Sequence, residues 1–579
     1  MKVVRIFAFF VLFPVVGSSC SGGQDKVAQQ PSGQQVTLET IYFGGDILTM
    51  EGSTPEYVDA IGVANGKISF VGDTDAAMIM ASNTTKTVDL AGKTLIPGFI
   101  DSHSHFLLTA VKLATVNLDP PPAGTVRSVA GIVESMRTEL QEGTYDDENW
   151  LFGWGYDTAM LVDGRHPTKA DLDLVSNDIP IALLHFSTHM VVANSRALDI
   201  MGIDEKSVAP EGGVIRRMPN SMEPNGVLEE QAIYPVFERL GDIGKGDRLV
   251  TLLDSAQELY VSNGFTTALE FGATPRDITS IKSYAASGKL KIDLIAAIIA
   301  ASQGAAETAK VHSNEYLNHF RIAGGKINLD GGTPGRTAYL RDPYHTQEEG
   351  MPNDYRGYSS IERQEDLNAI IQEFYKRNVP IFIHALGDAA IDQAIVAIQS
   401  AQGKFPREDI RTQLIHLQVL REDQLETLED LDVTLTFQNT HNFYFADFHN
   451  EVTLGPERTN KLNPLKSALE HGFSVTFHHD SPVHPVDSLG LIWIATNRAG
   501  RSGTVYGIEE RLTPYQALYA LTMAAAFQFF EEDKKGSLTA GKLADLLILS
   551  DNPLKIDRGK IRDIKVIETI KAGKTIYVR

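Results

Sequence analysis

Cysteine is almost absent from this sequence, since only Cys20 occurs among 579 residues. A single cysteine excludes internal disulfides and a metal centre built from several thiolates. Basic residues are also scarce, because 52 Lys and Arg oppose 74 Asp and Glu and give a formal net charge of -22. Nucleic-acid phosphates require a basic surface. We therefore expect no nucleic-acid partner.

The N-terminus has the organisation of an export signal. A short basic start precedes an apolar run at residues 6–16, which falls well short of the roughly 20 residues that a membrane span needs. Small residues lead to Cys20, and residues 1–19 resemble a bacterial lipoprotein signal with Cys20 as the lipidated first mature residue. Gly17 departs from that pattern, which usually has a larger aliphatic residue there. We expect an exported, lipid-anchored protein of the bacterial cell envelope that meets the membrane only through this lipid; the alternative is a periplasmic or secreted protein.

Both ends of the remaining chain are predicted to be β-structure. Residues 20–35 contain few apolar residues and indicate a flexible tether. From residue 36 short strand patterns follow one another, for example 40–43 and 47–50, and Asn65-Gly66 is typical of a tight hairpin. The C-terminus again shows strand patterns, at 546–549, 564–570 and 575–578.

The middle of the chain alternates between strand and helix patterns. Most of its short apolar strands are followed by an amphipathic segment, and the strands are expected at residues 266–271, 292–299, 326–329, 380–384, 412–416, 434–438 and 474–479. Such repeated β-α units predict a parallel sheet or a (β/α)8 barrel, in which chemistry gathers at the C-terminal ends of the strands. Residues 117–245 interrupt the alternation and are predicted to be an insertion.

Histidines and an aspartate occupy predicted strand ends. His103 and His105 form a His-x-His pair after an apolar approach, and His384, His416 and Asp480 end later strands. One histidine on a strand is commonly a packing residue, but four histidines and an aspartate at strand ends are hard to explain that way. The set predicts a divalent metal site, with zinc as the first candidate. Lys326 is the exception, because it is the first residue of the predicted strand 326–329.

At this point the sequence resembles the amidohydrolase superfamily, in particular its amidohydrolase 3 family, which includes N-substituted formamide deformylase. The resemblance covers nearly the whole chain after the signal. It is carried by the motifs Pro97–His105, Lys326–Gly331, His384–Ala389, His416, His479–Val483 and Gly536–Leu546.

The resemblance implies an α/β fold. Residues 96–524 would form a (β/α)8 TIM-type barrel, and residues 36–95 with 525–579 would form a small composite β-sandwich. It further implies a binuclear centre, one or two metals per chain, in which carboxylated Lys326 bridges the ions. His103, His105, Lys326 and Asp480 would hold one metal, and Lys326, His384 and His416 the other. The alternative for Lys326 is an ordinary lysine whose head group extends from the strand to solvent.

Two departures from the family pattern lie beside these ligands. The segment Leu414-Ile-His416 lacks the glutamate that usually precedes the histidine. In Phe477-His-His-Asp480, histidines replace a small residue and a Ser or Thr. Neither change removes a ligand, but both alter groups next to the metals.

The predicted chemistry is hydrolysis by metal-activated water. Asp480 would accept the proton of the attacking water and pass it to the leaving nitrogen. Glu270 is a second candidate acid, with orientation of a neighbouring loop as the alternative. His441, His478 and His479 are possible donors to the carbonyl oxygen.

The substrate pocket is predicted to include residues of the insertion. Trp154 and His189 are candidate pocket walls and, together with Glu270, our candidate substrate-binding residues. Packing between the insertion and the barrel is the alternative for the aromatic residues.

The leading hypothesis is an exported metal-dependent hydrolase of a C–N bond in a small-molecule amide, N-formyl or N-acyl compound, outside peptide bonds. The alternative is a cyclic-amide hydrolase or deaminase of the same superfamily. A non-catalytic binding lipoprotein is a third hypothesis, although a binding module needs no such set of metal ligands. No sequence feature predicts the oligomeric state.

Overall fold

The computed structural model describes residues 37–579, except for residues 211, 244–245 and 348–350. The predicted signal peptide, the tether and Cys20 lie outside the described residues. None of the helices in the described part combines the length and apolar character required to cross a membrane.

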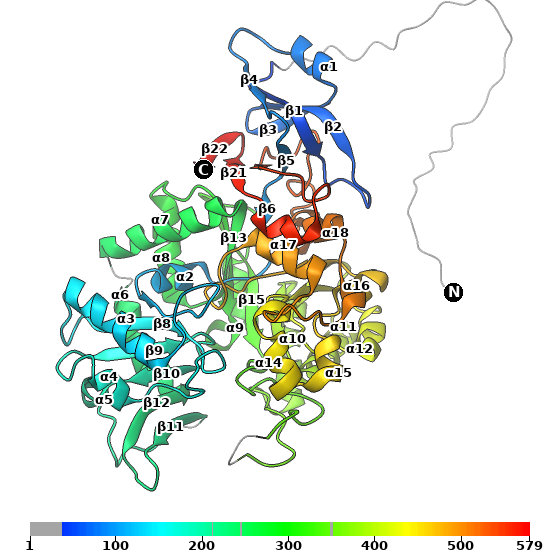
Figure 1. The fold of residues 1–579 in the computed structure, drawn as a ribbon. Helices are drawn as coiled ribbons and strands as arrows, with labels where there is room; N and C mark the ends of the chain where they lie inside the picture. The colour runs from blue at the N-terminus through cyan, green and yellow to red at the C-terminus, as the bar shows by residue number, and fades with distance from the viewer. Residues whose placement is uncertain (1–36, 211, 244–245, 348–350) are drawn as a thin grey trace, which may run out of the picture. The chain divides into compact units, whose positions relative to one another are not determined.

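A parallel sheet of eight strands carries the predicted strand-end residues (Figure 1). Its strands, in chain order, are β6 (Phe99–Ile100), β13 (Phe265–Ala273), β14 (Asp293–Ile299), β15 (Phe320–Asn328), β16 (Ile381–Ala385), β17 (Thr412–His416), β18 (Val433–Phe437) and β19 (Val475–Phe477). Each strand pairs with the next one in parallel register. The first and last strands meet where Ser102 Oγ, beyond β6, donates to Phe477 O of β19 at 2.9 Å. This arrangement confirms the α/β, TIM-like fold.

The strands are packed on both faces, as near-continuous apolar sequences in parallel sheets require. On one face, Phe271, Phe382 and Ile415 join Phe529 in a buried cluster to which six of the strands contribute, with the Phe271 and Phe382 ring centroids 4.6 Å apart. On the other face lie helices, among them α7 (Gly246–Ser262), α8 (Pro275–Ala286), α9 (Ala300–Val311), α10 (Gln364–Arg377), α11 (Asp388–Lys404), α12 (Glu422–Leu428), α16 (Leu465–Glu470), α17 (Ser488–Asn497) and α18 (Pro514–Ala520). The helix α19 (Met523–Gln528) instead contributes Ala525 and Ala526 to the cluster on the first face.

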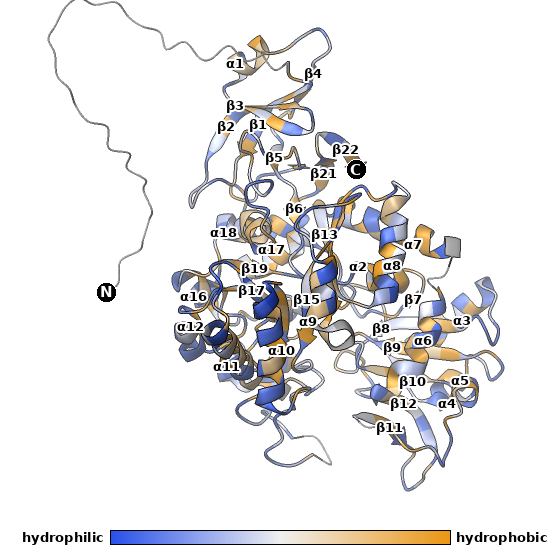
Figure 2. Cartoon of the chain, turned by 180° about the vertical axis from the view of Figure 1, so that it is seen from behind, coloured by the Kyte–Doolittle hydropathy of each residue, from blue (hydrophilic) through white to orange (hydrophobic). Residues whose placement is uncertain are grey.

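Helix α10 shows why these segments form the outer layer. Its buried residues Leu367, Ile371, Phe374 and Tyr375 recur at helical spacing. Figure 2 shows hydrophilic residues on other parts of its surface. The helix therefore packs one apolar stripe against the sheet and exposes the rest.

A second sheet is built from both ends of the described chain. Its strands are β1 (Thr40–Leu48), β2 (Tyr57–Ala64), β3 (Lys67–Gly72), β4 (Lys86–Asp89), β5 (Thr94–Pro97), β20 (Leu546–Leu549), β21 (Val566–Lys571) and β22 (Lys574–Val578). β5 joins the two halves, because it pairs with β1 in parallel and with β20 in antiparallel register. The predicted strands 40–43 and 47–50 are one strand, β1, with a register shift between Phe43 and Ile47. A two-layered sandwich goes beyond this pairing and stays a prediction.

The predicted insertion contains a third sheet. Its strands are β7 (Val116–Asn117), β8 (Leu151–Tyr156), β9 (Ile181–His185), β10 (Met190–Ala193), β11 (Gly213–Arg217) and β12 (Pro224–Glu230), in the order β11-β12-β10-β9-β8-β7. The helices α3 (Val129–Glu142), α4 (Lys169–Asp173), α5 (Ser195–Met201) and α6 (Tyr234–Ile243) accompany it, and α2 (Phe106–Lys112) connects it to β6.

A buried charge cluster joins the second sheet to the barrel strands. Asp293, at the start of β14, accepts a hydrogen bond from Lys571 Nζ of β21 at 2.6 Å and forms an ion pair with Lys535. Lys571 also contacts Asp545 at 2.7 Å. Burial alone would raise the pKa of Asp293, but the two lysines hold it well below its usual value. Asp293 therefore stays ionised in the folded protein.

We expect Asp293→Asn to lower the free energy of unfolding at pH 7 by about 3 to 5 kcal/mol, because the two buried lysines lose the carboxylate that they share and keep only Asp545 and Glu531 as partners. The folded pKa of Asp293 lies below the unfolded value of about 4, so its contribution is present above pH 4 and is lost as pH falls through the folded pKa. Thermal unfolding at pH 7 and below pH 3 measures both effects. The control Asp366→Asn, in an exposed ion pair with Arg363, should change little; an equal loss in both variants would contradict the prediction.

Candidate metal centre

The predicted ligands lie at the C-terminal ends of the parallel strands. His384 is the second-to-last residue of β16, His416 ends β17 and Asp480 follows β19. The prediction that Lys326 is the first residue of its strand is wrong. β15 begins at Phe320, so Lys326 lies near the C-terminal end of this strand. His103 and His105 follow β6, which ends at Ile100, rather than lying within it.

His103, His105 and Asp480 form the first group of potential ligands. The distances from Asp480 Oδ1 are 3.2 Å to His103 Nε2 and 3.4 Å to His105 Nε2. Lys326 Nζ lies 3.5 Å from His103 Nε2. The structure thus brings Lys326 to the same point as the His-x-His pair and the aspartate.

His416, His478 and Asp480 form a second group, within 4.8 Å of one another. His416 Nδ1 is 3.9 Å from Asp480 Oδ2, and the His384 and His416 ring centroids are 4.2 Å apart. His478 entered the sequence analysis only as a possible donor to the carbonyl oxygen. The structure places it among the potential ligands instead.

The backbone is strained at two of these residues. His416 has φ +80° and Asp480 has φ +57°, in the left-handed region that residues other than glycine seldom adopt. Such conformations cost on the order of 1 to 3 kcal/mol and cluster at functional sites. The strained backbone favours a functional role for the side chains of His416 and Asp480 over a role in packing alone.

Unsatisfied buried atoms test whether the residues fit a metal. Among the described residues, both ring nitrogens of His416 and His478, Nε2 of His384 and Oδ1 of Asp480 are buried without a hydrogen bond. Leaving such groups unpaired is costly, and imidazole nitrogen and carboxylate oxygen are the donors that zinc-type ions prefer. Burial holds the pKa of His384 and His416 well below the usual value, which keeps the imidazoles neutral, as ligands must be. The donor set therefore fits a divalent metal.

Lys326 is 2% exposed and thus as deeply buried as His416. Burial lowers its pKa to about 7, and the nearby Asp480 opposes that shift only in part. A large fraction of its amine is therefore neutral near pH 7.

Glu270 and His189 lie around the centre on different elements. Glu270 is buried in β13, and its Oε2 accepts a hydrogen bond from Leu107 N at 2.5 Å. Burial raises the pKa of Glu270 to about 8 against the opposing effect of His105. His189 Nδ1 lies 3.1 Å from Glu230 Oε2, and although burial acts to lower its pKa, this hydrogen bond raises it.

Other candidates from the sequence point elsewhere. Trp154 is fully buried in the main hydrophobic core, as the alternative of a packing residue predicts. A part of Trp154 in a substrate pocket stays a prediction. His479 Nδ1 accepts from Ser481 N at 2.9 Å, and its Nε2 lies 3.7 Å from Asp101 Oδ1. His441 lies against His449, with 3.2 Å between Nδ1 and Nε2.

Asp330 and Gln438 contribute to the centre but were not among the predicted site residues. The Asp330 carboxylate accepts backbone hydrogen bonds from Tyr339, Leu386 and Gly387 at 2.8 to 3.0 Å, and its Oδ1 lies 3.5 Å from His384 Nε2. Gln438 Nε2 donates to Asp480 Oδ2 at 3.0 Å. Asp330 directly follows the predicted strand 326–329, and Gln438 ends the predicted strand 434–438, so a polar residue at a strand end was the available signal.

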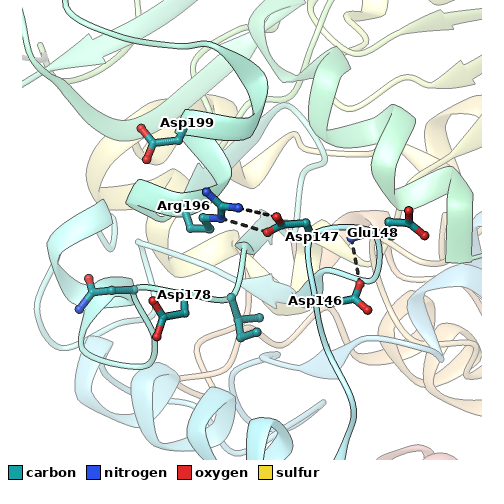
Figure 3. Close-up of a pocket in the computed structure, with 8 residues that line it drawn as sticks. Asp146, Asp147, Glu148, Asp178, Arg196 and Asp199 are labelled. Atoms are coloured by element: carbon teal, nitrogen blue, oxygen red, sulfur yellow. Dashed lines mark hydrogen bonds and ion pairs between the residues drawn. The ribbon is translucent and has the colours of Figure 1, made fainter.

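A surface hollow in the insertion is chemically different (Figure 3). Arg196 faces Asp147, with 3.0 Å between Nε and Oδ1, and further acidic residues surround the pair. The hollow is lined by Asp146, Asp147, Glu148, Asn177, Asp178, Ile179, Arg196 and Asp199, and includes none of the predicted site residues.

The family model described as "Amidohydrolase family" matches residues 86–577 of this chain. The chain belongs to the amidohydrolase family. This membership confirms the family predicted from the sequence and, with it, a metal-dependent hydrolase.

Individual relatives agree with this membership. The chain is 26% identical to the protein YtcJ of Bacillus subtilis, over 93% of this chain and 99% of that protein. It is also 26% identical to the N-substituted formamide deformylase of Arthrobacter pascens, over 90% and 95%. A metal-dependent hydrolase structure from Pyrococcus horikoshii has a TM-score of 0.71 at 23% identity, covering 90% of this chain and 99% of that one. The structural likeness supports the fold.

We expect the purified amidohydrolase to hold about one to two divalent ions per chain, and His384→Ala combined with His416→Ala to remove at least one, because these rings supply otherwise unpaired donors. Elemental analysis of metal-loaded protein measures this. The control is His471→Ala, whose ring is held by surface Glu422 and Glu429. Unchanged metal content in the double variant would show that the strand-end histidines are packing residues.

Proposed function

We propose that this amidohydrolase cleaves a non-peptide C–N bond in a small molecule: an amide, an N-formyl or an N-acyl group. The observation that carries the proposal is the gathering of His103, His105 and Asp480 at a point that also receives Lys326. The deformylase relative from Arthrobacter pascens supports the choice of substrate class.

We assign the metal to two groups of ligands. His103, His105, Lys326 and Asp480 would hold one ion, and Lys326, His384 and His416 the other, with zinc as the first candidate. Divalent ions bound in such a site make water more acidic and polarise a carbonyl group. Lys326 would serve as a carbamate: its neutral Nζ adds to carbon dioxide and releases one proton, which converts a potential cation into an anionic bridge.

Asp480 moves the proton. Its carboxylate accepts the proton of the attacking water and then gives it to the leaving nitrogen as the C–N bond breaks. Water supplies the hydroxyl that the acyl group gains and the hydrogen that the amine gains, so the atoms balance. His189 and Glu270 are proposed to contact the substrate, and Trp154 to support the pocket from the core.

A screen of N-formyl, N-acetyl and longer N-acyl amines and amino acids tests the proposal. The metal-loaded protein should release the free amine from at least one class, and the metal-free protein should not. Release of ammonia instead would favour the deaminase alternative. A metal-loaded protein that hydrolyses none of these compounds would contradict the proposal and favour a binding role.

The location is a separate proposal. We propose cleavage before Cys20 and lipid attachment to it, supported by the basic start, the apolar run and the lone cysteine. Mass spectrometry of the mature N-terminus should find a lipid-modified Cys20 and, in Cys20→Ala, an unmodified chain. An unmodified wild-type N-terminus at another residue would contradict it.

A further inference from the structure

Gln438 holds one oxygen of the Asp480 carboxylate. Gln438 follows β18, and its Nε2 donates to Asp480 Oδ2 at 3.0 Å, while Oδ1 faces His103 and His105. Gln438 is 3% exposed, so water cannot readily replace this bond. The two carboxylate oxygens thus have separate partners: an amide on one side and the candidate ligands on the other.

A second glutamine fixes the orientation of the first. Gln438 Oε1 accepts from Gln418 Nε2 at 3.3 Å, and Gln418 Oε1 accepts from Thr333 Oγ1 at 2.6 Å. An amide whose oxygen is occupied by a donor must present its NH₂ group at the other end. Gln438 therefore turns its donor, not its acceptor, toward Asp480.

His449 lies at the start of this series of hydrogen bonds. Burial lowers the pKa of His449 to about 3, so the ring is neutral and carries one N–H. Its Nδ1 lies 2.6 Å from Thr453 Oγ1, and its Nε2 lies 3.4 Å from Thr333 Oγ1. Since the Thr333 hydroxyl donates to Gln418, it can only accept from His449. In this tautomer Nε2 carries the hydrogen, which Thr333 Oγ1 shares with His441 Nδ1 at 3.2 Å, and Nδ1 accepts from Thr453.

We propose that His449, Thr333, Gln418 and Gln438 form a one-way hydrogen-bond chain that positions the Asp480 carboxylate for proton transfer. The inference rests on the proposed role of Asp480 as the base. Every donor in the chain points toward Asp480, and aligned hydrogen bonds in a buried site polarise and strengthen one another. Gln438 is thus a positioning residue.

This hydrogen-bond chain also connects four separate parts of the barrel. Asp480 follows β19, Gln438 follows β18, Gln418 follows β17 and Thr333 follows β15. Misplacement of a reacting group by 1 Å can cost about 100-fold in rate. The four links fix the base relative to strands that carry the other candidate ligands.

Gln438→Met tests the last link in the metal-loaded full chain, with N-butylformamide or the most rapidly hydrolysed amide of the screen as substrate. Loss of a hydrogen bond to a charged group should lower kcat by roughly 10- to 100-fold. KM should stay within about twofold and metal content should not change. The control is Gln413→Met, because Gln413 is a buried amide of β17 whose polar atoms have no partner; its kcat should stay near the wild-type value.

Two substitutions of Gln418 test the direction of the hydrogen-bond chain. Gln418→Met removes a link, whereas the isosteric Gln418→Glu places an acceptor beside Gln438 Oε1, so that the Gln438 amide turns its donor away from Asp480. We expect Gln418→Glu to lower kcat several-fold more than Gln418→Met. A purely structural role predicts the opposite order, because glutamate preserves the packing, and that order would contradict the inference.

A double-mutant cycle links the effect to Asp480. In the Asp480→Asn background, Gln438→Met should lower the remaining kcat by less than about threefold, because the group that Gln438 positions no longer accepts a proton. An equal fold-loss in both backgrounds would overturn the inference. A wild-type protein that hydrolyses no amide would instead contradict the proposed function itself, so the two failures are distinguishable.

Discussion

Asp480→Asn should lower the turnover number by roughly 100-fold or more, the usual scale for a positioned acid–base group. The asparagine has nearly the same size, and its oxygen can still ligate a metal weakly, but it cannot accept the proton of the attacking water. Substrate binding should change little, so the loss should fall on kcat rather than KM. Steady-state kinetics on a confirmed substrate, together with elemental analysis, measure both.

The control for this prediction is Asp392→Asn, an acidic residue on α11 that contacts Arg421. It should retain wild-type turnover. If Asp480→Asn kept near-normal turnover, the assignment of the proton shuttle would be wrong. Glu270 would be the next residue to test, because it is buried in β13 and burial raises its pKa to about 8.

Lys326→Ala should lose bound metal and activity together. The side chain lies among the candidate ligands, 3.5 Å from His103 Nε2, and its carbamate would bridge the two groups of ligands. Alanine leaves a space at that position. We expect partial recovery of metal content and turnover when acetate or propionate is added, because a short carboxylate can supply the missing anionic oxygens.

The same acids should not rescue Asp480→Asn, which lacks a proton acceptor rather than a bridge, and this comparison is the control. Elemental analysis and turnover are measured across a concentration series of each acid. Full metal content in Lys326→Ala without added acid would contradict the bridging role. Lys326 would then be an ordinary buried lysine.

The order of the barrel strands could be predicted from sequence because apolar runs alternate with amphipathic segments. Thr412–His416 and Leu546–Leu549 were predicted with their observed bounds. The strand of Lys326 was predicted to begin at residue 326, whereas β15 begins at Phe320 and includes Arg321, Gly324 and Gly325. In the structure Arg321 pairs with buried Glu531 at 3.3 Å. A Cβ at Gly324 would lie 2.1 Å from Pro380 O, so tertiary packing explains the glycine.

The candidate ligands could be predicted because parallel strands bring their C-terminal ends together. The bonds of Gln418, Gln438 and Thr333 could not, since they join side chains from separate loops whose paths depend on the complete fold. His478 was difficult for a related reason: after a short strand, sequence alone does not say toward which side each histidine of a consecutive pair turns.

The sheet that unites both chain ends has a consequence for biosynthesis. Residues 94–97 of β5 pair with residues 546–549 of β20, so the edge of β5 that does not pair with β1 has no partner until β20 has been synthesised. At about 5 to 20 residues per second, roughly 20 to 90 seconds separate the synthesis of these two strands. During that interval the nascent chain exposes an open strand edge of the kind that invites aggregation. Premature termination before β20 should therefore yield products that depend on chaperones or are degraded.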